Sequence, residues 1–134
     1  MQIVIDTNVV ASGIFFGGLP HKLLQLVIGN EISTIVSTEI ISEYYETFQH
    51  LLKDKNYVPK KDISVASLVD NMTIILPSSN VKVCRDPDDD KFINCAIDGK
   101  CKYIVSGDKD LLDIKRFQDI EIMTVRGFMD EYGK

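Results

Sequence analysis

The sequence has few histidines and cysteines, which limits the metal sites and cross-links that it can form. Its two histidines, His21 and His50, lie far apart in the chain, and this argues against a histidine-rich zinc site. The three cysteines, Cys84, Cys95 and Cys101, are an odd number without C-x-x-C spacing. We therefore expect reduced, mostly buried thiols, as in a reducing cytosol, rather than a disulfide framework.

Long hydrophobic runs are also missing. No apolar stretch reaches the length that a transmembrane helix needs. The start, MQIVID, lacks the basic flank and the long apolar segment of a secretion signal. In addition, an expected strand begins almost at Met1. These absences predict a cytoplasmic protein with no membrane contact.

Positive charge is in the minority. The chain has 15 lysines and arginines against 20 aspartates and glutamates, a net charge of −5. This balance argues against a protein that holds nucleic acid by neutralising many phosphates. It does not exclude a nuclease whose positive charge arrives as a bound metal ion.

The order of apolar segments indicates an α/β fold. With 134 residues the chain has the size of one domain, and we expect a single domain over residues 1–134. Short apolar runs alternate with amphipathic ones, which favours a central, mainly parallel sheet of about five strands covered on both faces. The predicted strands are 3–5, 32–36, 74–76, 103–106 and 120–125, with a possible extended piece at 81–84. The predicted helices are 22–28, 38–53, 59–69, 89–98, 108–114 and a final turn at 128–132.

Acidic residues gather at particular places in this layout. Asp6 follows the first strand, Glu43 lies on the helix of residues 38–53, and Asp108 follows the strand at 103–106. Parallel sheets place ligands beyond the carboxyl ends of their strands. Clustered carboxylates repel each other and need a compensating cation, and hard oxygen ligands select Mg²⁺, Mn²⁺ or Ca²⁺ over zinc. Further acids crowd two motifs, namely Asp86, Asp88, Asp89 and Asp90 in RDPDDDKF and Asp110 in VSGDKDLL.

Each acid also has an ordinary structural interpretation. Asp6 could cap the turn after its strand, and Glu43 could belong to a solvated helix face. Acids at 88–90 and at 108–110 could cap helices and complement their dipoles. These interpretations explain single residues well, but they explain the whole set of acids less well than a metal site does.

Other chemistries fit the sequence less well. Asp86, Asp88 and Asp90 match the first, third and fifth positions of an EF-hand calcium loop, but Lys91 replaces its glycine and Ile97 its final glutamate. The chain contains no P-loop, no G-x-G-x-x-G and no G-x-S-x-G motif. An aspartate-nucleophile phosphatase would carry a second Asp two residues after Asp6, where this chain has Asn8.

Taken together, IDTNVV, the glutamate on the second helix, DDDKFINCAI and VSGDKDLL resemble the PIN-domain nucleases over nearly the whole chain. The resemblance is closest to the toxin-like (VapC-like) branch of type II toxin–antitoxin systems. It implies a three-layer α/β/α sandwich with one acidic pocket at the carboxyl edge of the sheet. By position, the catalytic and metal-binding acids would be Asp6, Glu43, Asp90 and Asp108, with Asp110 as a further metal ligand and Asn8, Ser106 and Thr7 in supporting roles. Asp88 or Asp89 could share the role of Asp90.

The resemblance further implies metal-dependent endoribonuclease activity with one or two Mg²⁺ or Mn²⁺ ions. A metal ion at such a site polarises the scissile phosphate and lowers the pKa of the attacking water. RNA would be the substrate, and the expected partners are an antitoxin protein and, in a homodimer, a second copy of the chain. Phosphate contacts are expected from Lys109, Lys115 and Arg116. A non-catalytic PIN-like scaffold that binds RNA or a partner remains the alternative.

Overall fold

The computed structural model describes residues 1–133, and its centre is a six-stranded sheet. Neighbouring strands run parallel except for β5 and β6, which are antiparallel. The α/β fold with a mainly parallel sheet is therefore confirmed, with six strands where about five were expected. In the spatial order β3-β2-β1-β4-β6-β5, the strands are β3 (Thr73–Ile75), β2 (Ser33–Ser37), β1 (Gln2–Ile5), β4 (Tyr103–Val105), β6 (Ile120–Met123) and β5 (Arg116–Phe117).

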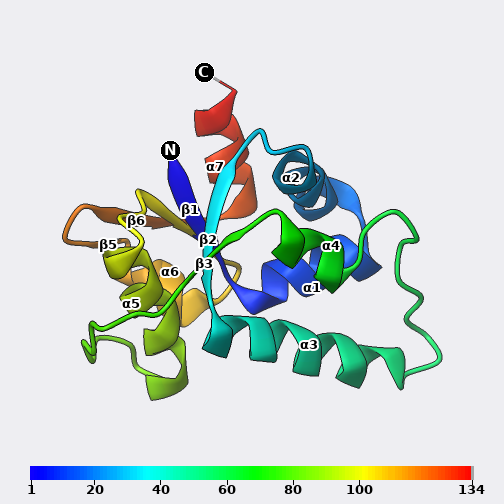
Figure 1. The fold of residues 1–134 in the computed structure, drawn as a ribbon, viewed down its shortest axis with the longest axis horizontal. Helices are drawn as coiled ribbons and strands as arrows, with labels where there is room; N and C mark the ends of the chain where they lie inside the picture. The colour runs from blue at the N-terminus through cyan, green and yellow to red at the C-terminus, as the bar shows by residue number, and fades with distance from the viewer. Residues whose placement is uncertain (134) are drawn as a thin grey trace.

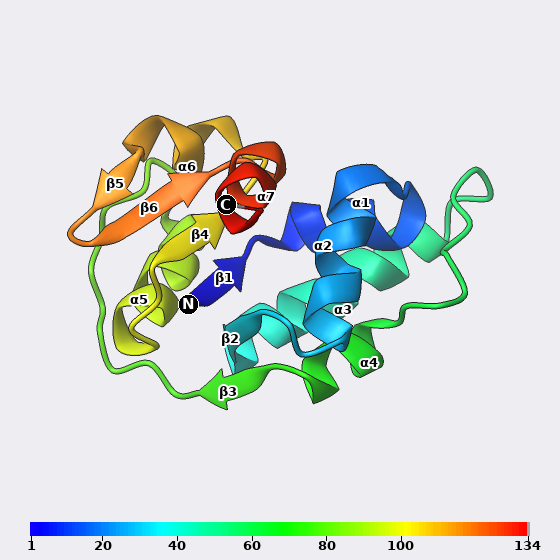
Figure 2. The ribbon, with the colours of Figure 1, turned by 90° about the horizontal axis from the view of Figure 1, so that it is seen from above.

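Helices flank the sheet on both sides. Figure 2 shows α5 on one side of the sheet and α1, α2 and α4 on the other, with the strands between them. Helix α3 runs across the end of the molecule towards which β1 and β2 point (Figure 1). The helices are α1 (Thr7–Phe15), α2 (Gly18–Ile28), α3 (Thr38–Leu52), α4 (Val65–Asp70), α5 (Asp90–Asp98), α6 (Lys109–Ile114) and α7 (Val125–Tyr132), with a 3₁₀ turn, η1 (Pro87–Asp89), before α5.

The two central strands fix the position of the first acid. Ile3, Val4 and Ile5 of β1 are completely buried, as expected for a strand covered on both faces. Strand β1 pairs in parallel with β4, and Ile5 is in register with Val105. The backbone N–H of Asp6 continues this ladder and donates to the carbonyl of Val105 at 2.9 Å. The residues that follow the two strands therefore start side by side at the carboxyl edge of the sheet.

Several predicted boundaries were wrong for identifiable reasons. The helix expected from Pro59 begins only at Val65, because Ser64 and Ser67 form a reciprocal capping box there. The helix expected at residue 22 already begins at Gly18. The apolar stretch after Asp6, which is not among the predicted helices, forms α1.

Two further differences concern extended segments. Residues 81–84 form no strand, because their backbone bonds to side chains of α5 instead of to a neighbouring strand. Strand β5 was not predicted, since its two residues are too few to show an alternating pattern.

The predictions about the cysteines and about membrane-spanning helices can be compared with the structure. The three cysteines are unpaired, with Cys95 and Cys101 buried and Cys84 half-buried, which agrees with the predicted thiols. Within residues 1–133, no single helix has the length and apolar character needed to cross a membrane. The pair α1 and α2 meets that criterion only together, and the two helices are bent by 101°.

Candidate active site

Asp6 is buried at the carboxyl end of β1, and its side chain is not used as a helix cap. It occupies the N-cap position of α1 without a side-chain capping bond, and it is only 4 % exposed. Its Oδ2 atom accepts a hydrogen bond from Ser106 Oγ at 2.6 Å. Burial raises the pKa of Asp6, the charges of Asp108 and Glu43 raise it further, and the Ser106 hydrogen bond partly opposes them.

Asp108 lies beside Asp6 and also caps a helix. Its Oδ1 atom accepts a hydrogen bond from the backbone N–H of Asp110 at 3.0 Å, so Asp108 is the N-cap of α6. The backbone N–H of Asp108 donates to Ser106 Oγ at 2.9 Å. Ser106, which is fully buried, therefore connects Asp6 and Asp108 through one hydroxyl group.

Asp89 completes this group of acids. Its pKa is raised to about 7, chiefly by burial, then by the charge of Asp108 and a hydrogen bond with the Asp108 side chain, and further by Asp6. Two carboxyl groups can share a hydrogen bond only if a proton lies between them, because carboxylates are acceptors only. A hard divalent cation is the other way to neutralise such a pair.

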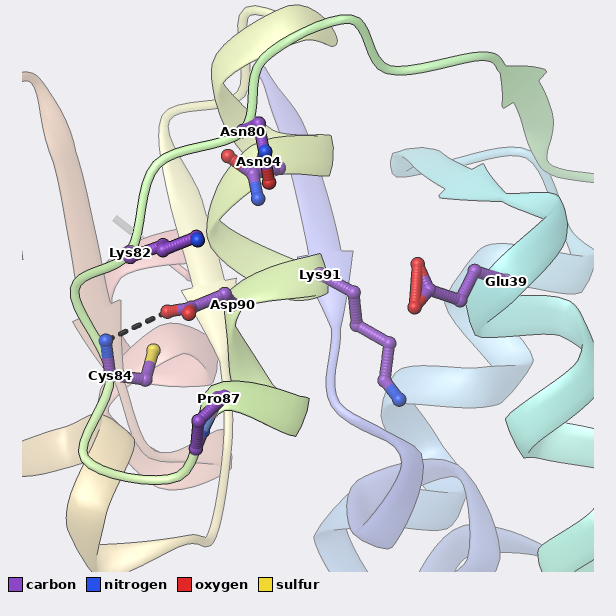
Figure 3. Close-up of a pocket in the computed structure, with 8 residues that line it drawn as sticks. All are labelled: Glu39, Asn80, Lys82, Cys84, Pro87, Asp90, Lys91 and Asn94. Atoms are coloured by element: carbon purple, nitrogen blue, oxygen red, sulfur yellow. Dashed lines mark hydrogen bonds between the residues drawn. The ribbon is translucent and has the colours of Figure 1, made fainter.

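The carboxylate of Asp90 makes its contacts elsewhere. Its Oδ1 atom accepts the backbone N–H groups of Val83 at 3.0 Å and Cys84 at 2.7 Å. Burial acts to raise its pKa, but these hydrogen bonds hold the pKa of Asp90 below its usual value. Figure 3 shows Asp90 directed towards Cys84, while Lys91 extends the opposite way, towards α3. Asp108 thus contributes to the raised pKa of Asp89, whereas the pKa of Asp90 is set by its own burial and by its hydrogen bonds to residues 83–84.

Glu43 reaches the same region from α3. The helix is anchored to the end of β1 by Tyr44, whose buried hydroxyl donates to the carbonyl of Ile5 at 2.5 Å. The two carboxylate oxygens of Glu43 have separate partners, since Thr7 Oγ1 donates to Oε1 and the Lys91 ammonium pairs with Oε2. Lys91 also lies 3.1 Å from Asp88. Burial would lower the pKa of Lys91, but these two acids raise it above its usual value.

The remaining supporting and binding residues lie around this centre. Asn8 is exposed, as is Lys115. Asp110 lies 3.8 Å from the exposed Arg85. Two of the predicted phosphate-binding residues form surface ion pairs within their own segments, namely Lys109 with Asp113 at 2.9 Å and Arg116 with Glu121 at 2.6 Å.

A hollow of about 390 Å³ lies between α3, α5 and the segment before η1 (Figure 3), and Asp90 lines it, whereas Asp6, Asp89 and Asp108 do not. A second hollow of about 280 Å³ continues from it and shares Glu39, Asn80, Lys91 and Asn94. Both are open enough for a polar ligand to enter. The first is lined by Glu39, Asn80, Lys82, Cys84, Pro87, Asp90, Lys91 and Asn94.

The donor set fits a hard divalent cation in its chemistry. Asp6, Asp89 and Asp108 offer carboxylate oxygens, and the Asp89–Asp108 pair needs a proton or a cation between its members. In residues 1–133, however, no three histidine, cysteine or acidic side chains are already arranged as a metal-binding group. Small rotations of side chains would therefore have to accompany metal binding.

Sequence reasoning did not single out Tyr44 or Lys91. Tyr44 fits the apolar pattern of the helix at 38–53, and Lys91 enters the sequence analysis only as the residue in place of an EF-hand glycine. The DDD sequence could not decide which aspartate faces the site, because that depends on where the 3₁₀ turn ends. The turn at Pro87–Asp89 places Asp89 before the α-helix and Asp90 at its first residue. A proline three residues before the last Asp was the available signal for such a turn.

Comparisons with known proteins identify the family of the chain. The chain is 30 % identical to an uncharacterized protein of Methanocaldococcus jannaschii in an alignment of 145 positions that covers 100 % of this chain and 93 % of the relative. Residues 2–110 match the sequence profile of the PIN domain. This stretch contains every acid of the cluster described above. PIN domains are generally nucleases, and the chain belongs to the PIN domain family.

Proposed function

We propose that the protein is a metal-dependent endoribonuclease that hydrolyses RNA phosphodiesters at Asp6, Asp89 and Asp108. The observation that carries the proposal is the carboxylate of Asp6, which is 4 % exposed and has the charges of Asp108 and Glu43 beside it. Burying like charges together is costly, and a bound cation offsets that cost. Membership of the PIN family supports nuclease chemistry at this edge of the sheet.

Asp6, Asp89 and Asp108 would hold a Mg²⁺ or Mn²⁺ ion, which would polarise the phosphate and lower the pKa of an attacking water. Ser106 keeps Asp6 in a fixed orientation through its 2.6 Å hydrogen bond. Asp90 acts indirectly in this proposal, because it fastens residues 83–84 to α5 and so supports the turn that carries Asp89. Asp110 is near enough to the site to assist through Asp108, whose side chain it helps to fix.

We further infer that the nuclease is a toxin neutralised by an antitoxin protein. The resemblance of its motifs to toxin-like PIN domains supports this role. An open, largely apolar hollow of about 360 Å³ at the C-terminal half of α3 and the start of α4 also supports it, as a surface for a partner. Tyr45, Phe48 and Leu52 line this hollow, and Tyr45 and Leu52 are exposed. Expression of the chain alone should arrest growth, and co-expression of the protein encoded beside it should restore growth.

Cleavage of a labelled RNA by purified protein tests the enzymatic proposal. Activity should require Mg²⁺ or Mn²⁺ and disappear in excess EDTA. Asp6→Asn should lower the rate by at least about 100-fold, because it removes a charged metal ligand while keeping the side-chain size. Lys60→Ala, on the exposed loop after α3, is the matched control and should stay within about twofold of wild type.

Two results would contradict the proposal. Equal rates for wild type and Asp6→Asn would show that cleavage comes from a contaminant or another site. Tight RNA binding without cleavage, under all metal conditions, would favour the non-catalytic scaffold.

A further inference from the structure

His21 holds three segments together at the junction of α1 and α2. It lies in the first turn of α2, and its side chain is 17 % exposed. Its Nδ1 atom lies 2.9 Å from the carbonyl oxygen of Gly13, in the last turn of α1. Its Nε2 atom lies 3.0 Å from the carboxylate of Asp62, on the connection between α3 and α4. The ring therefore ties this connection to the two N-terminal helices.

Both partners of His21 can only accept hydrogen bonds. A backbone carbonyl has no proton to donate, and an ionised carboxylate has none either. A neutral imidazole carries one N–H group and can satisfy one of these partners, whereas an imidazolium carries two and satisfies both. The two contacts seen together are thus the contacts of a protonated ring.

Loss of one ring proton should free Asp62 rather than Gly13. Gly13 is buried, so its carbonyl oxygen would be costly to leave without a donor. The Asp62 side chain is 53 % exposed, so water can take the place of the Nε2–H group. The neutral ring then keeps its proton on Nδ1 and presents a lone pair to the carboxylate.

The stretch around Asp62 forms one edge of the apolar hollow at α3 and α4. Just before it, the backbone N–H of Lys60 donates to the carbonyl of Ile14 at 2.7 Å. Just after it, Ser64 caps α4 and lines the hollow together with Val65. The contact with His21 therefore fixes the connection between its backbone anchor on α1 and the start of α4.

Asp62 is the acid that pairs with His21. Helix α1 carries no charged residue that could compete with this pair. The other charged residues on the elements packed around His21 are Lys22 on α2, Lys53, Asp54, Lys55, Lys60 and Lys61 on the connection, Asp70 on α4, and Arg126, Asp130 and Glu131 on α7.

We propose that the contact between His21 and Asp62 is a proton-controlled latch. The protonated ring fastens the α3–α4 connection to α1 and α2, and the neutral ring releases it and loosens one edge of the apolar hollow. Imidazoles change charge within the physiological pH range, so a modest change of pH operates such a latch. The inference goes beyond the proposed nuclease function and does not depend on it.

Histidine NMR tests the protonation state of the ring directly. Long-range ¹H–¹⁵N spectra of ¹⁵N-histidine-labelled protein should show His21 with protons on both ring nitrogens at about pH 5.5 and on Nδ1 alone at about pH 8.5. The chain has only two histidines, and His50→Gln leaves the signal of His21 alone. A ring protonated on Nε2 alone at the higher pH, or a neutral ring at the lower pH, would overturn the latch.

Hydrogen exchange followed by mass spectrometry tests whether the latch holds the connection. The protection of the amides of residues 61–64, corrected for intrinsic exchange, should fall by about threefold between about pH 5.5 and pH 8.5, as expected for an ion pair with one exposed member. Because Asp89 also titrates in this range, with a pKa of about 7, the comparison of variants decides the question.

Asp62→Asn is the decisive variant. A side-chain amide can donate to the lone pair of a neutral imidazole and accept from a protonated one, so the contact persists at both pH values. The protection of residues 61–64 in Asp62→Asn should therefore differ by less than about 1.5-fold between the two pH values. His50→Gln, which changes the exposed histidine of α3, is the control and should keep the wild-type pH dependence.

Three exchange results would overturn the latch: equal protection at both pH values in the wild type, an unchanged pH dependence in Asp62→Asn, or loss of that dependence in His50→Gln. Each of them would leave the nuclease proposal standing, because neither measurement involves RNA or metal. A protein that fails to cleave RNA but shows the expected exchange and NMR signals would overturn the nuclease proposal and support the latch.

Discussion

Removing the charge of Asp89 should make the metal-free protein more stable. The pKa of Asp89 is raised from 3.8 to about 7, mainly by burial and by Asp108. A shift of that size would amount to about 4 kcal/mol for a fully shielded group. Asp89 is only half-buried, so screening by solvent reduces the expected gain of Asp89→Asn to about 1–2 kcal/mol. For a chain of 134 residues this is a rise of roughly 3–8 °C in Tm.

The gain should depend on pH in a defined direction. The folded-state pKa of Asp89 lies above its unfolded value, so the wild-type chain loses stability as the pH rises from about 4 to about 7. The advantage of Asp89→Asn should therefore be small near pH 4, grow with pH and level off above about pH 7.

Thermal unfolding followed by circular dichroism in EDTA, at pH 5 and pH 8, measures this difference. Asp119→Asn, at an exposed position between β5 and β6, is the control and should change Tm by no more than about 1 °C at either pH. An Asp89→Asn variant that is less stable than wild type at pH 8, or equally stable at both pH values, would refute the crowding of acids at this site.

Three further predictions concern the metal and the scaffold. Saturating Mn²⁺ at about 100 times its Kd should stabilise wild type by about 2.7 kcal/mol, whereas NaCl of equal ionic strength should not, and the Mn²⁺ effect should largely vanish in Asp6→Asn/Asp108→Asn. Tyr44→Phe should lower the free energy of unfolding, measured by urea titration, by about 1–2 kcal/mol, because the buried hydrogen bond to the Ile5 carbonyl is lost. An unchanged urea midpoint would show that this hydrogen bond does not anchor α3. Gly99→Ala should lower the free energy of unfolding by about 1–3 kcal/mol, since the added Cβ would lie 2.7 Å from Ile35. The control Gly107→Ala, whose added Cβ meets nothing within 4 Å, should leave the urea midpoint unchanged.

The layers of the fold could be predicted because they depend on long apolar patterns. The runs that became β1 and β4 are buried on both faces, and their hydrophobicity is continuous in the sequence. Element ends were harder to predict, because they depend on particular side-chain bonds. The start of α4 is fixed by the Ser64–Ser67 capping box, which outweighs the helical pattern that begins at Pro59.

The positions of the candidate acids relative to the sheet could be predicted, but their individual contacts could not. Asp6 and Asp108 follow parallel neighbours, so strand order alone brings them together. The choice between Asp89 and Asp90 depends on a single 3₁₀ turn, and the partner of Glu43 depends on the direction of one lysine side chain. Neither leaves a periodic signal in the sequence, because the first depends on one short local turn and the second on a contact between segments distant in the chain.

The RNA cleavage rates of Asp89→Asn and Asp90→Asn, compared in saturating Mn²⁺, test the assignment of the catalytic centre most directly. Asp89→Asn should lose at least about 100-fold in rate because a metal ligand is removed, while Asp90→Asn should stay within about tenfold because its carboxylate accepts hydrogen bonds from the backbone of residues 83–84. The reverse order, with Asp90→Asn inactive and Asp89→Asn close to a cleaving wild type, would contradict a centre built from Asp6, Asp89 and Asp108.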